Sequence, residues 1–256
     1  IIVMNTKNLY QINRKDKNRA GGKAASLGDM ISADFLVPPG FVILTPSFNR
    51  YKRSKQIDSK TSEEILERFD ALKLKKAAVR SSALVEDSAQ ASWAGIFESY
   101  LDVKKSKVLA AVEDCWRAVS SEKVKAYAKQ QGIKIKNIHM AVVVQEMIDA
   151  DMAGVCFTVN PISKQKNEMI IEACAGSGDK LVNGEVTPNC YVVDKKTSKV
   201  IDVQTKSKIN ITDEQLRQLS DDCLKIEKHF GYPCDIEWCI KDDKTFILQA
   251  RPITTL

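Results

Sequence analysis

Apolar residues recur along this chain with two different periods, one typical of strands and one typical of helices. A period of two runs through 234–252, and a continuous apolar run over 139–147 predicts a strand that is buried on both faces. Strands are expected at 41–44, 77–79, 97–103, 139–147, 153–159, 168–174, 234–241 and 245–252. A period near 3.6 predicts amphipathic helices at 21–34, 108–119, 122–131 and 212–230, and a further helix from Thr61 with Glu64 in a capping box. This mixture predicts a fold of the α/β (α+β) class.

The alternation in 234–252 places polar side chains on one face of each strand of the expected hairpin. Asp235 and Glu237 share a face of the first strand, and Gln249 and Arg251 share a face of the second. The register decides whether these two faces coincide, because a slip of one residue turns every side chain to the other face.

Two turns compete for this hairpin. A two-residue turn at 242–243 would place Gln249 opposite Ile236, on the apolar side. A three-residue loop at 242–244 would bring the two polar faces together. We predict the three-residue loop, for which the facing pairs are Lys241 with Thr245, Glu237 with Gln249, and Asp235 with Arg251.

This register predicts a site for a small, hard cation. Opposed side chains in a hairpin lie about 5 Å apart at Cβ, so the Glu237 carboxylate and the Gln249 amide oxygen can share one ion. Mg²⁺ fits, because it takes oxygen ligands and is commonly held by one or two protein groups and nucleotide phosphates. Arg251 would then contact a phosphate through its planar guanidinium group. The alternative is a core hairpin with an ordinary surface ion pair between Asp235 and Arg251.

A polar loop follows the strand at 77–79 and is a second candidate site. It begins at Arg80, contains many small residues and continues past Gly95, a composition that lets backbone N–H groups approach a charged ligand. It differs from the phosphate loop of the common NTPases, since the sequence contains no GxxxxGK followed by Ser or Thr. Lys23, in the first turn of the helix at 21–34, either contacts phosphate or is a surface lysine after a flexible turn.

Composition narrows the class of protein. The 256 residues can bury the core of one large domain or two lobes, and a hydrophobic content of 44% with 28% charged residues is ordinary for a globular protein. The net charge of +6 comes from scattered lysines, which suits a nucleotide and does not indicate nucleic-acid binding. Seven cysteines without a CxxC pair and only two histidines do not indicate zinc. We expect no membrane segment and a cytoplasmic location.

Several sequence blocks, taken in order, resemble one family. AVRSSALVEDSAQASWAGIFESYLDV is similar to the nucleotide-binding segment of phosphoenolpyruvate synthases, pyruvate phosphate dikinases and the related rifampin phosphotransferases. The blocks GGKAASLGDM, VPPGFVILT, VQEM with MAGVCFTVNP, and IEKHFGYPCDIEW with FILQARP resemble the other blocks of that family. The resemblance covers nearly the whole chain from Gly21 onward. The loop at Gly176 departs from it, because the family usually has Gly-Leu-Gly-Glu there.

The resemblance implies an ATP-grasp fold, in which two lobes close over ATP, and we expect the lobes at 1–137 and 138–256. By motif position, phosphate contacts, a phosphate-covering loop and an adenine hinge are expected. The implied ATP-binding residues are Lys23, Arg80, Gly95, Ser99, Gln145, Glu146, Met147 and Ile148, the implied Mg²⁺ ligands are Glu237 and Gln249, and the implied catalytic residues are Arg80, Glu237, Gln249 and Arg251. Glu172 is open between a place near the nucleotide and simple solvation at its strand end.

In the resembled enzymes, ATP phosphorylates or pyrophosphorylates a histidine on a separate domain. We find no block in this sequence for that domain or for a pyruvate-binding barrel, so three interpretations stay open: an excised domain, a subunit that works with a separate phosphocarrier, and a kinase acting directly on a small molecule. A non-catalytic, ATP-binding regulatory module is an alternative of another class. Such a module would keep Lys23 and the hinge but would need neither the metal pair nor Arg251.

Overall fold

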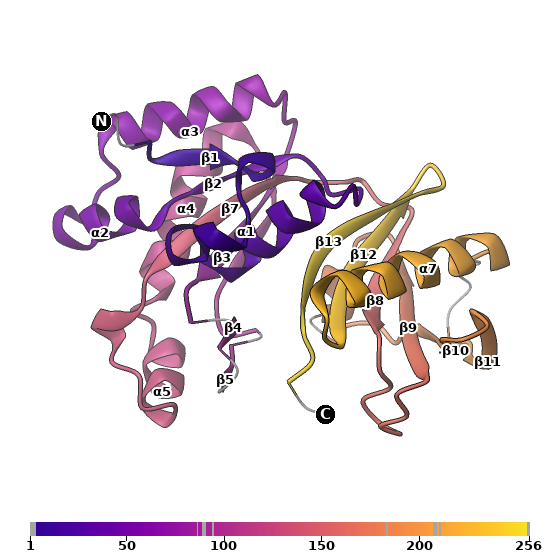
Figure 1. The fold of residues 1–256 in the computed structure, drawn as a ribbon. Coiled ribbons are helices and arrows are strands. Elements are labelled where there is room, and N and C mark those ends of the chain that lie inside the picture. Colours follow the sequence, from indigo (N-terminus) through magenta and orange to yellow (C-terminus); the bar gives the residue numbers. More distant parts are fainter. Residues whose placement is uncertain are drawn as a thin grey trace. The chain divides into compact units, whose positions relative to one another are not determined.

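The structure is a computed structural model that describes residues 4–254 except 86, 89–90, 94, 183, 207–208 and 210. The chain forms two compact units (Figure 1). Unit 1 contains the described residues of Ile1–Ser32 and Pro38–Met147, and unit 2 those of Ala33–Val37 and Ile148–Leu256.

Both units contain helices and strands. Unit 1 contains β1 (Thr6–Asn8), α1 (Lys17–Ser32), β2 (Gly40–Ile43), α2 (Thr45–Ser54), α3 (Ser59–Ala71), β3 (Ala77–Ala83), β4 (Asp87–Ser88), β5 (Ala91–Ser92), β6 (Ser99–Val103), α4 (Val108–Ala118), α5 (Glu122–Gln130) and β7 (Met140–Glu146). Short 3-10 helices lie at Leu9–Gln11, Arg14–Asp16, Lys105–Lys107 and Ile135–Asn137. Unit 2 contains β8 (Met152–Phe157), β9 (Glu168–Ala175), α6 (Asp179–Val182), β10 (Asn189–Asp194), β11 (Lys199–Gln204), α7 (Asp213–Phe230), β12 (Cys234–Lys241) and β13 (Lys244–Pro252). The α+β class predicted from the sequence is confirmed.

Unit 1 is built on an antiparallel sheet with the strand order β1-β2-β7-β3-β6. The apolar run that predicted a doubly buried strand forms β7, in which five consecutive residues from Met140 are fully buried. The lobe boundary expected at 137/138 differs from the boundary between the compact units, because β7 pairs with β2 and β3 of unit 1. A continuous apolar run shows that a strand is buried but not which sheet it joins.

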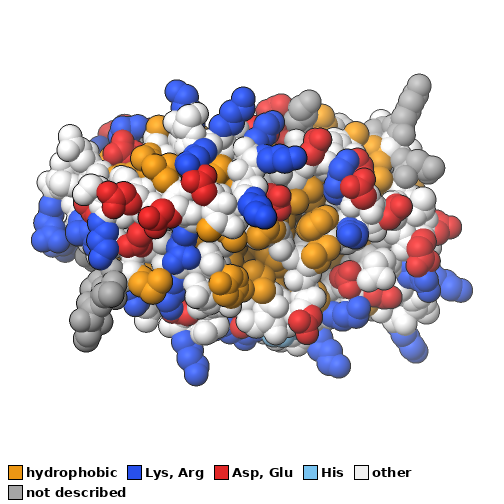
Figure 2. Space-filling model, turned by 90° about the horizontal axis from the view of Figure 1, so that it is seen from above, with side chains coloured by type: hydrophobic (Ala, Val, Ile, Leu, Met, Phe, Trp, Pro, Cys, Tyr) orange, Lys and Arg blue, Asp and Glu red, His pale blue; other side chains and the backbone are white. Residues whose placement is uncertain are grey.

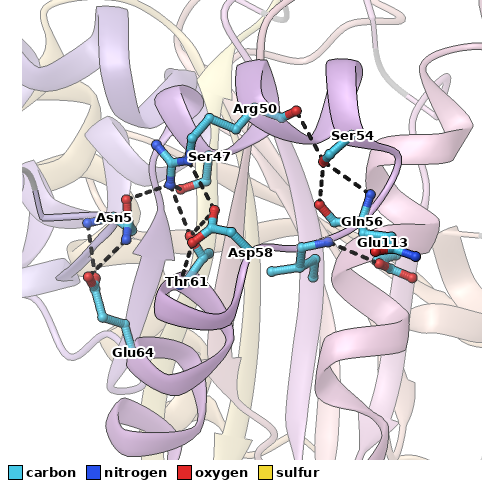
Figure 3. A network of polar contacts seen from close by, with 10 residues as sticks. Asn5, Ser47, Arg50, Ser54, Gln56, Asp58, Thr61, Glu64 and Glu113 are labelled. Carbon is cyan, nitrogen blue, oxygen red and sulfur yellow. Dashed lines mark hydrogen bonds and ion pairs between the residues drawn. The ribbon is translucent and has the colours of Figure 1, made fainter.

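The start of α3 is set by Asp58, whose carboxylate accepts a hydrogen bond from the Thr61 N–H at 2.9 Å. The predicted capping box of Thr61 and Glu64 is therefore wrong. Glu64 instead accepts hydrogen bonds from the backbone and side chains of Asn5 and Thr6, which fixes β1 against α3. Figure 3 shows the bonds between Glu64 and Asn5. Paired carboxylate bonds of this kind hold a short edge strand in place.

Unit 2 is built on a six-stranded antiparallel sheet with the order β11-β10-β9-β8-β12-β13. Helix α7, which the sequence predicted at 212–230, runs across one face of this sheet (Figure 1) and begins at a capping box of Thr212 and Gln215. Cys223 of α7 contacts Cys156 of β8, so the face that carries Cys156 and Ile236 is the one the helix covers. The polar side chains of the hairpin therefore lie on the opposite face.

Charges of both signs are interspersed on the face shown in Figure 2, where no large area carries lysine and arginine alone. Within the described residues, every helix is too short or too polar to cross a bilayer.

Candidate functional site

The hairpin of β12 and β13 brings together the side chains that the sequence predicted to meet. Glu237 faces Gln249, and Asp235 faces Arg251. The predicted pairing of the two polar faces is confirmed.

The turn that produces this pairing is not the one we predicted. Lys241 faces Lys244, so the turn contains only Asp242 and Asp243, which have φ angles of 48° and 59°. Two successive left-handed residues are typical of a type I′ turn, which matches the twist of the flanking strands, and aspartate tolerates this conformation. The expected three-residue loop is wrong.

A β-bulge restores the register that the shorter turn would have lost. The pairing shifts by one position between Glu237 and Trp238, and Leu248 is the additional residue on β13. Without the bulge, the two-residue turn would set Gln249 opposite Ile236. The bulge therefore turns Gln249 and Arg251 to the face that carries the acids.

The polar face extends across two further strands of unit 2, β8 and β9. Val155 of β8 pairs with both Glu237 and Glu172 of β9, and Phe157 pairs with Asp235. Directly paired residues point to the same face of a sheet. The polar side chains on this face include Glu172, Asp235, Glu237, Gln249 and Arg251.

Asp235 and Arg251 form a partly buried ion pair through one carboxylate oxygen. Both Nε and Nη2 of Arg251 lie 2.7 Å from Oδ2 of Asp235, whose side chain is 12% exposed. Burial raises the pKa of Asp235, and the nearby guanidinium group of Arg251 opposes that rise. The pairing orients Arg251 and leaves Oδ1 of Asp235 buried without a hydrogen-bond partner.

The side chain of Gln249 shows whether a metal ion fits this site. Its side chain is 4% exposed, and its amide oxygen Oε1 has no hydrogen-bond partner. A buried carbonyl oxygen without a donor costs about 1–3 kcal/mol, which a bound cation would offset. The arrangement therefore fits a hard divalent ion held by the Gln249 oxygen and the facing Glu237.

Protein groups alone do not complete such a metal site. Among the residues that the structure describes, no group of three or more His, Cys, Asp or Glu side chains is arranged to hold a metal ion. Mg²⁺ typically retains water and takes substrate phosphate oxygens as ligands, so two protein ligands are sufficient.

Glu172 is a residue whose place the sequence left open. Burial and the nearby Asp235 carboxylate raise its pKa. It shares the polar face with the carboxylates of Asp235 and Glu237, so three acidic side chains gather on this face. The sequence signal was its position in the apolar strand at 168–174, but only the strand order shows that β9 lies two strands from the hairpin.

In unit 1, α1 approaches β3 closely at Gly21, two residues before Lys23. Gly21 has φ of 78°, and a Cβ at this position would lie 2.0 Å from the carbonyl oxygen of Ser82. The Ser82 hydroxyl donates to the Ala20 carbonyl at 2.9 Å and accepts from the Ala24 N–H at 3.2 Å. Only glycine allows both the backbone conformation and this contact.

Lys23, Arg80 and Ser99 come together around β3. The Lys23 ammonium group donates to the Ser81 carbonyl at 2.9 Å. Arg80 points to the same face of the sheet as Ser82, which is the face that α1 covers, and it pairs with the exposed Ser99 of β6. The structure therefore brings together three of the predicted phosphate-binding residues. Gly95 lies in a turn closed by a hydrogen bond from the Ile96 N–H to the Trp93 carbonyl, and no contact places it beside those three among the described residues.

The predicted adenine hinge lies at the end of β7, where the chain passes from unit 1 to unit 2. The N–H groups of Glu146 and Met147 donate to the carbonyls of Pro39 and Lys76, at 2.8 and 3.0 Å. The buried Gln145 amide donates to the Pro38 carbonyl at 3.4 Å. These donors are therefore already used within the protein, which the sequence did not show.

The family described as "Pyruvate phosphate dikinase, AMP/ATP-binding domain" matches residues 54–210 and 202–256. A probable phosphoenolpyruvate synthase of Methanocaldococcus jannaschii is 32% identical, and the match covers 100% of this chain and 28% of that protein. The uncharacterized phosphotransferase YvkC of Bacillus subtilis is also 32% identical, over 97% of this chain and 35% of the relative. The chain thus spans about a third of the length of these relatives.

Among solved structures, D-alanine–D-alanine ligase from Bacillus anthracis aligns over 91% of this chain and 60% of its own, with 10% identity and a TM-score of 0.44.

Proposed function

The chain belongs to the family of pyruvate phosphate dikinase AMP/ATP-binding domains, and on that premise we propose that it binds Mg-ATP and transfers phosphate from it. The acceptor is a histidine on a separate domain or protein, or a small molecule. We further infer that the two compact units are the two lobes of an ATP-grasp fold. The observation that carries the proposal is the buried, unpartnered oxygen of Gln249 opposite Glu237.

Unit 2 supports the metal and transfer part of this function. Glu237 and Gln249 would hold Mg²⁺, which when bound neutralises negative charge on phosphate oxygens. Arg251 is 33% exposed, so its guanidinium group can reach a phosphate while Asp235 fixes its direction. A preoriented arginine stabilises charge that grows on a transferred phosphoryl group, because it need not reorganise during the reaction.

Unit 1 supports the binding of phosphates. Lys23 and Arg80 supply positive charge, and the exposed Ser99 hydroxyl lies beside Arg80. The hydrogen bond from Lys23 to the Ser81 carbonyl holds the ammonium group near β3, and a phosphate is a stronger partner for that group than a carbonyl.

The hinge supports adenine binding through one carbonyl. Glu146 donates to Pro39, but Pro39 has no N–H with which to return a hydrogen bond to the Glu146 carbonyl. An adenine amino group would supply that missing donor. Because the N–H groups of Glu146 and Met147 are engaged, we expect backbone carbonyl groups of the hinge to bind the base.

Incubation with Mg-ATP followed by separation of the nucleotides tests the proposal. AMP with phosphate indicates dikinase chemistry, and ADP indicates a simple kinase. The reaction is run alone, with a cell lysate as a source of carrier protein, and with a panel of small metabolites. Bound but unchanged ATP under all three conditions would contradict the proposal and favour a regulatory module.

A further inference from the structure

Helix α5 carries two side chains that contact the segment leading into β6. The Lys123 ammonium group donates to the Gly95 carbonyl at 2.6 Å. The Tyr127 ring meets the Trp93 ring edge to face, with centroids 4.8 Å apart and an interplanar angle of 74°. Lys123 and Tyr127 are four residues apart, so they lie on one face of α5. A single helix face thus holds this segment by a polar and an aromatic contact.

The aromatic contact continues through the segment itself. Trp93 is 1% exposed and stacks on Phe97, with centroids 5.2 Å apart and rings within 9° of parallel. Both rings belong to the hydrophobic core of unit 1, against which Tyr127 also packs. Trp93 and Phe97 therefore anchor the two ends of a short turn to the core.

The peptide group between Gly95 and Ile96 is held at both of its polar atoms. Its carbonyl accepts from Lys123, and its N–H donates to the Trp93 carbonyl at 3.1 Å. Gly95 has φ of 67°, while a Cβ there would meet no atom within 4 Å, so glycine is required for the backbone conformation and not for space. Fixing this peptide fixes the direction in which the chain continues toward Ser99.

We propose that Lys123 and Tyr127 are positioning residues of the nucleotide site. They act through Gly95 and Trp93 to hold the chain from Gly95 to β6 in the conformation that places Ser99 opposite Arg80. The proposal rests on the proposed function, because it assigns a purpose to the phosphate-binding segment.

Substitutions on α5 test the polar contact. Lys123→Met removes the ammonium group and keeps the apolar stem, and Lys123→Arg can restore the bond. Lys125→Ala is the matched control, since Lys125 lies on the same helix and pairs with Glu122 at the surface at 2.7 Å. The readouts are amide hydrogen exchange of 95–103 without nucleotide and the dissociation constant for Mg-ATP by calorimetry. Tyr127→Leu tests the aromatic contact with the same two measurements.

Loss of a charged hydrogen bond corresponds to about a tenfold change, so Lys123→Met is expected to raise exchange at 95–99 and weaken Mg-ATP binding by about that factor. Lys123→Arg and Lys125→Ala are expected to behave like the wild type. Unchanged exchange in Lys123→Met would show that Lys123 does not hold the segment at 95–99. Faster exchange with an unchanged affinity for Mg-ATP would show that Lys123 is not a positioning residue of the nucleotide site. A wild type that binds no Mg-ATP would refute the proposed function, while the exchange data would still decide on the anchor.

Discussion

Replacing Gln249 by methionine is expected to stabilise the protein and to remove its metal-dependent binding of ATP. The amide oxygen of Gln249 is buried and accepts no hydrogen bond, whereas methionine fills a similar volume without a polar atom. Relief of one unsatisfied buried acceptor is worth about 1–3 kcal/mol. For a chain of this size, that gain raises the unfolding midpoint by about 2–4 °C per kcal/mol. Stability gained at the expense of function is common where a binding site stores an unfavourable arrangement.

The matched control is a second buried amide in the same sheet. The Asn189 oxygen accepts from the Lys206 N–H at 2.8 Å, so Asn189→Leu leaves that donor unpaired and is expected to destabilise by about 1–3 kcal/mol. The measurement is thermal unfolding without metal or nucleotide, followed by calorimetry of ATP with Mg²⁺ or with chelator. A lower midpoint for Gln249→Met, or full Mg²⁺-dependent ATP binding by that variant, would refute the reasoning.

Four further predictions test other parts of the structure. Glu237→Gln or Arg251→Ala is expected to lower the rate of phosphate transfer by orders of magnitude and to retain much of the ATP binding. A transfer assay and calorimetry measure the two effects, and an active Arg251→Ala variant would exclude the role assigned to Arg251. Lys23→Ala is expected to raise the dissociation constant for ATP, and an unchanged constant would remove Lys23 from the site. Gly154→Ala places a Cβ 1.8 Å from the Glu172 carbonyl oxygen and is expected to cost about 1–3 kcal/mol or more in chemical denaturation, whereas an unaffected midpoint would show that β8 and β9 separate easily. Of the seven cysteines, six are buried and Cys190 is half-buried, and burial raises the pKa of Cys115, Cys234 and Cys239 to about 12. At most one thiol is therefore expected to react rapidly with an aromatic disulfide reagent before denaturation. Rapid reaction of several thiols would contradict this packing.

The hairpin shows how far the sequence could predict the candidate site. The period of two correctly placed Glu237 and Gln249 on polar faces, and the requirement that those faces coincide correctly selected the pairing. The sequence did not show how that pairing is reached. A type I′ turn and a bulge at Leu248 together give the register that we assigned to a longer loop, and period alone cannot distinguish the two solutions.

Contacts between elements that are distant in the sequence explain the remaining differences. Glu64 has the spacing of a capping residue, but β1 offers its carboxylate several donors from Asn5 and Thr6, and these outweigh the local partner. β7 joins unit 1 because β2 and β3 flank it, and Glu172 reaches the polar face because β9 pairs with β8. Each of these outcomes depends on strand order, which hydrophobic spacing does not encode.

The charges of the two units explain why the expected ligand is a metal complex of ATP. On its polar face unit 2 carries three carboxylates and one guanidinium group, and burial raises the pKa of both Glu172 and Asp235. A raised carboxyl pKa means that the folded state binds protons more tightly than the unfolded state, so these two groups reduce stability as the pH rises through their folded pKa values. A bare triphosphate would be repelled by this face, whereas a divalent cation would relieve the same repulsion. Unit 1, with Lys23 and Arg80 beside β3, has the opposite preference and suits the phosphates directly. The distribution of charge thus predicts that Mg²⁺ strengthens the binding of ATP.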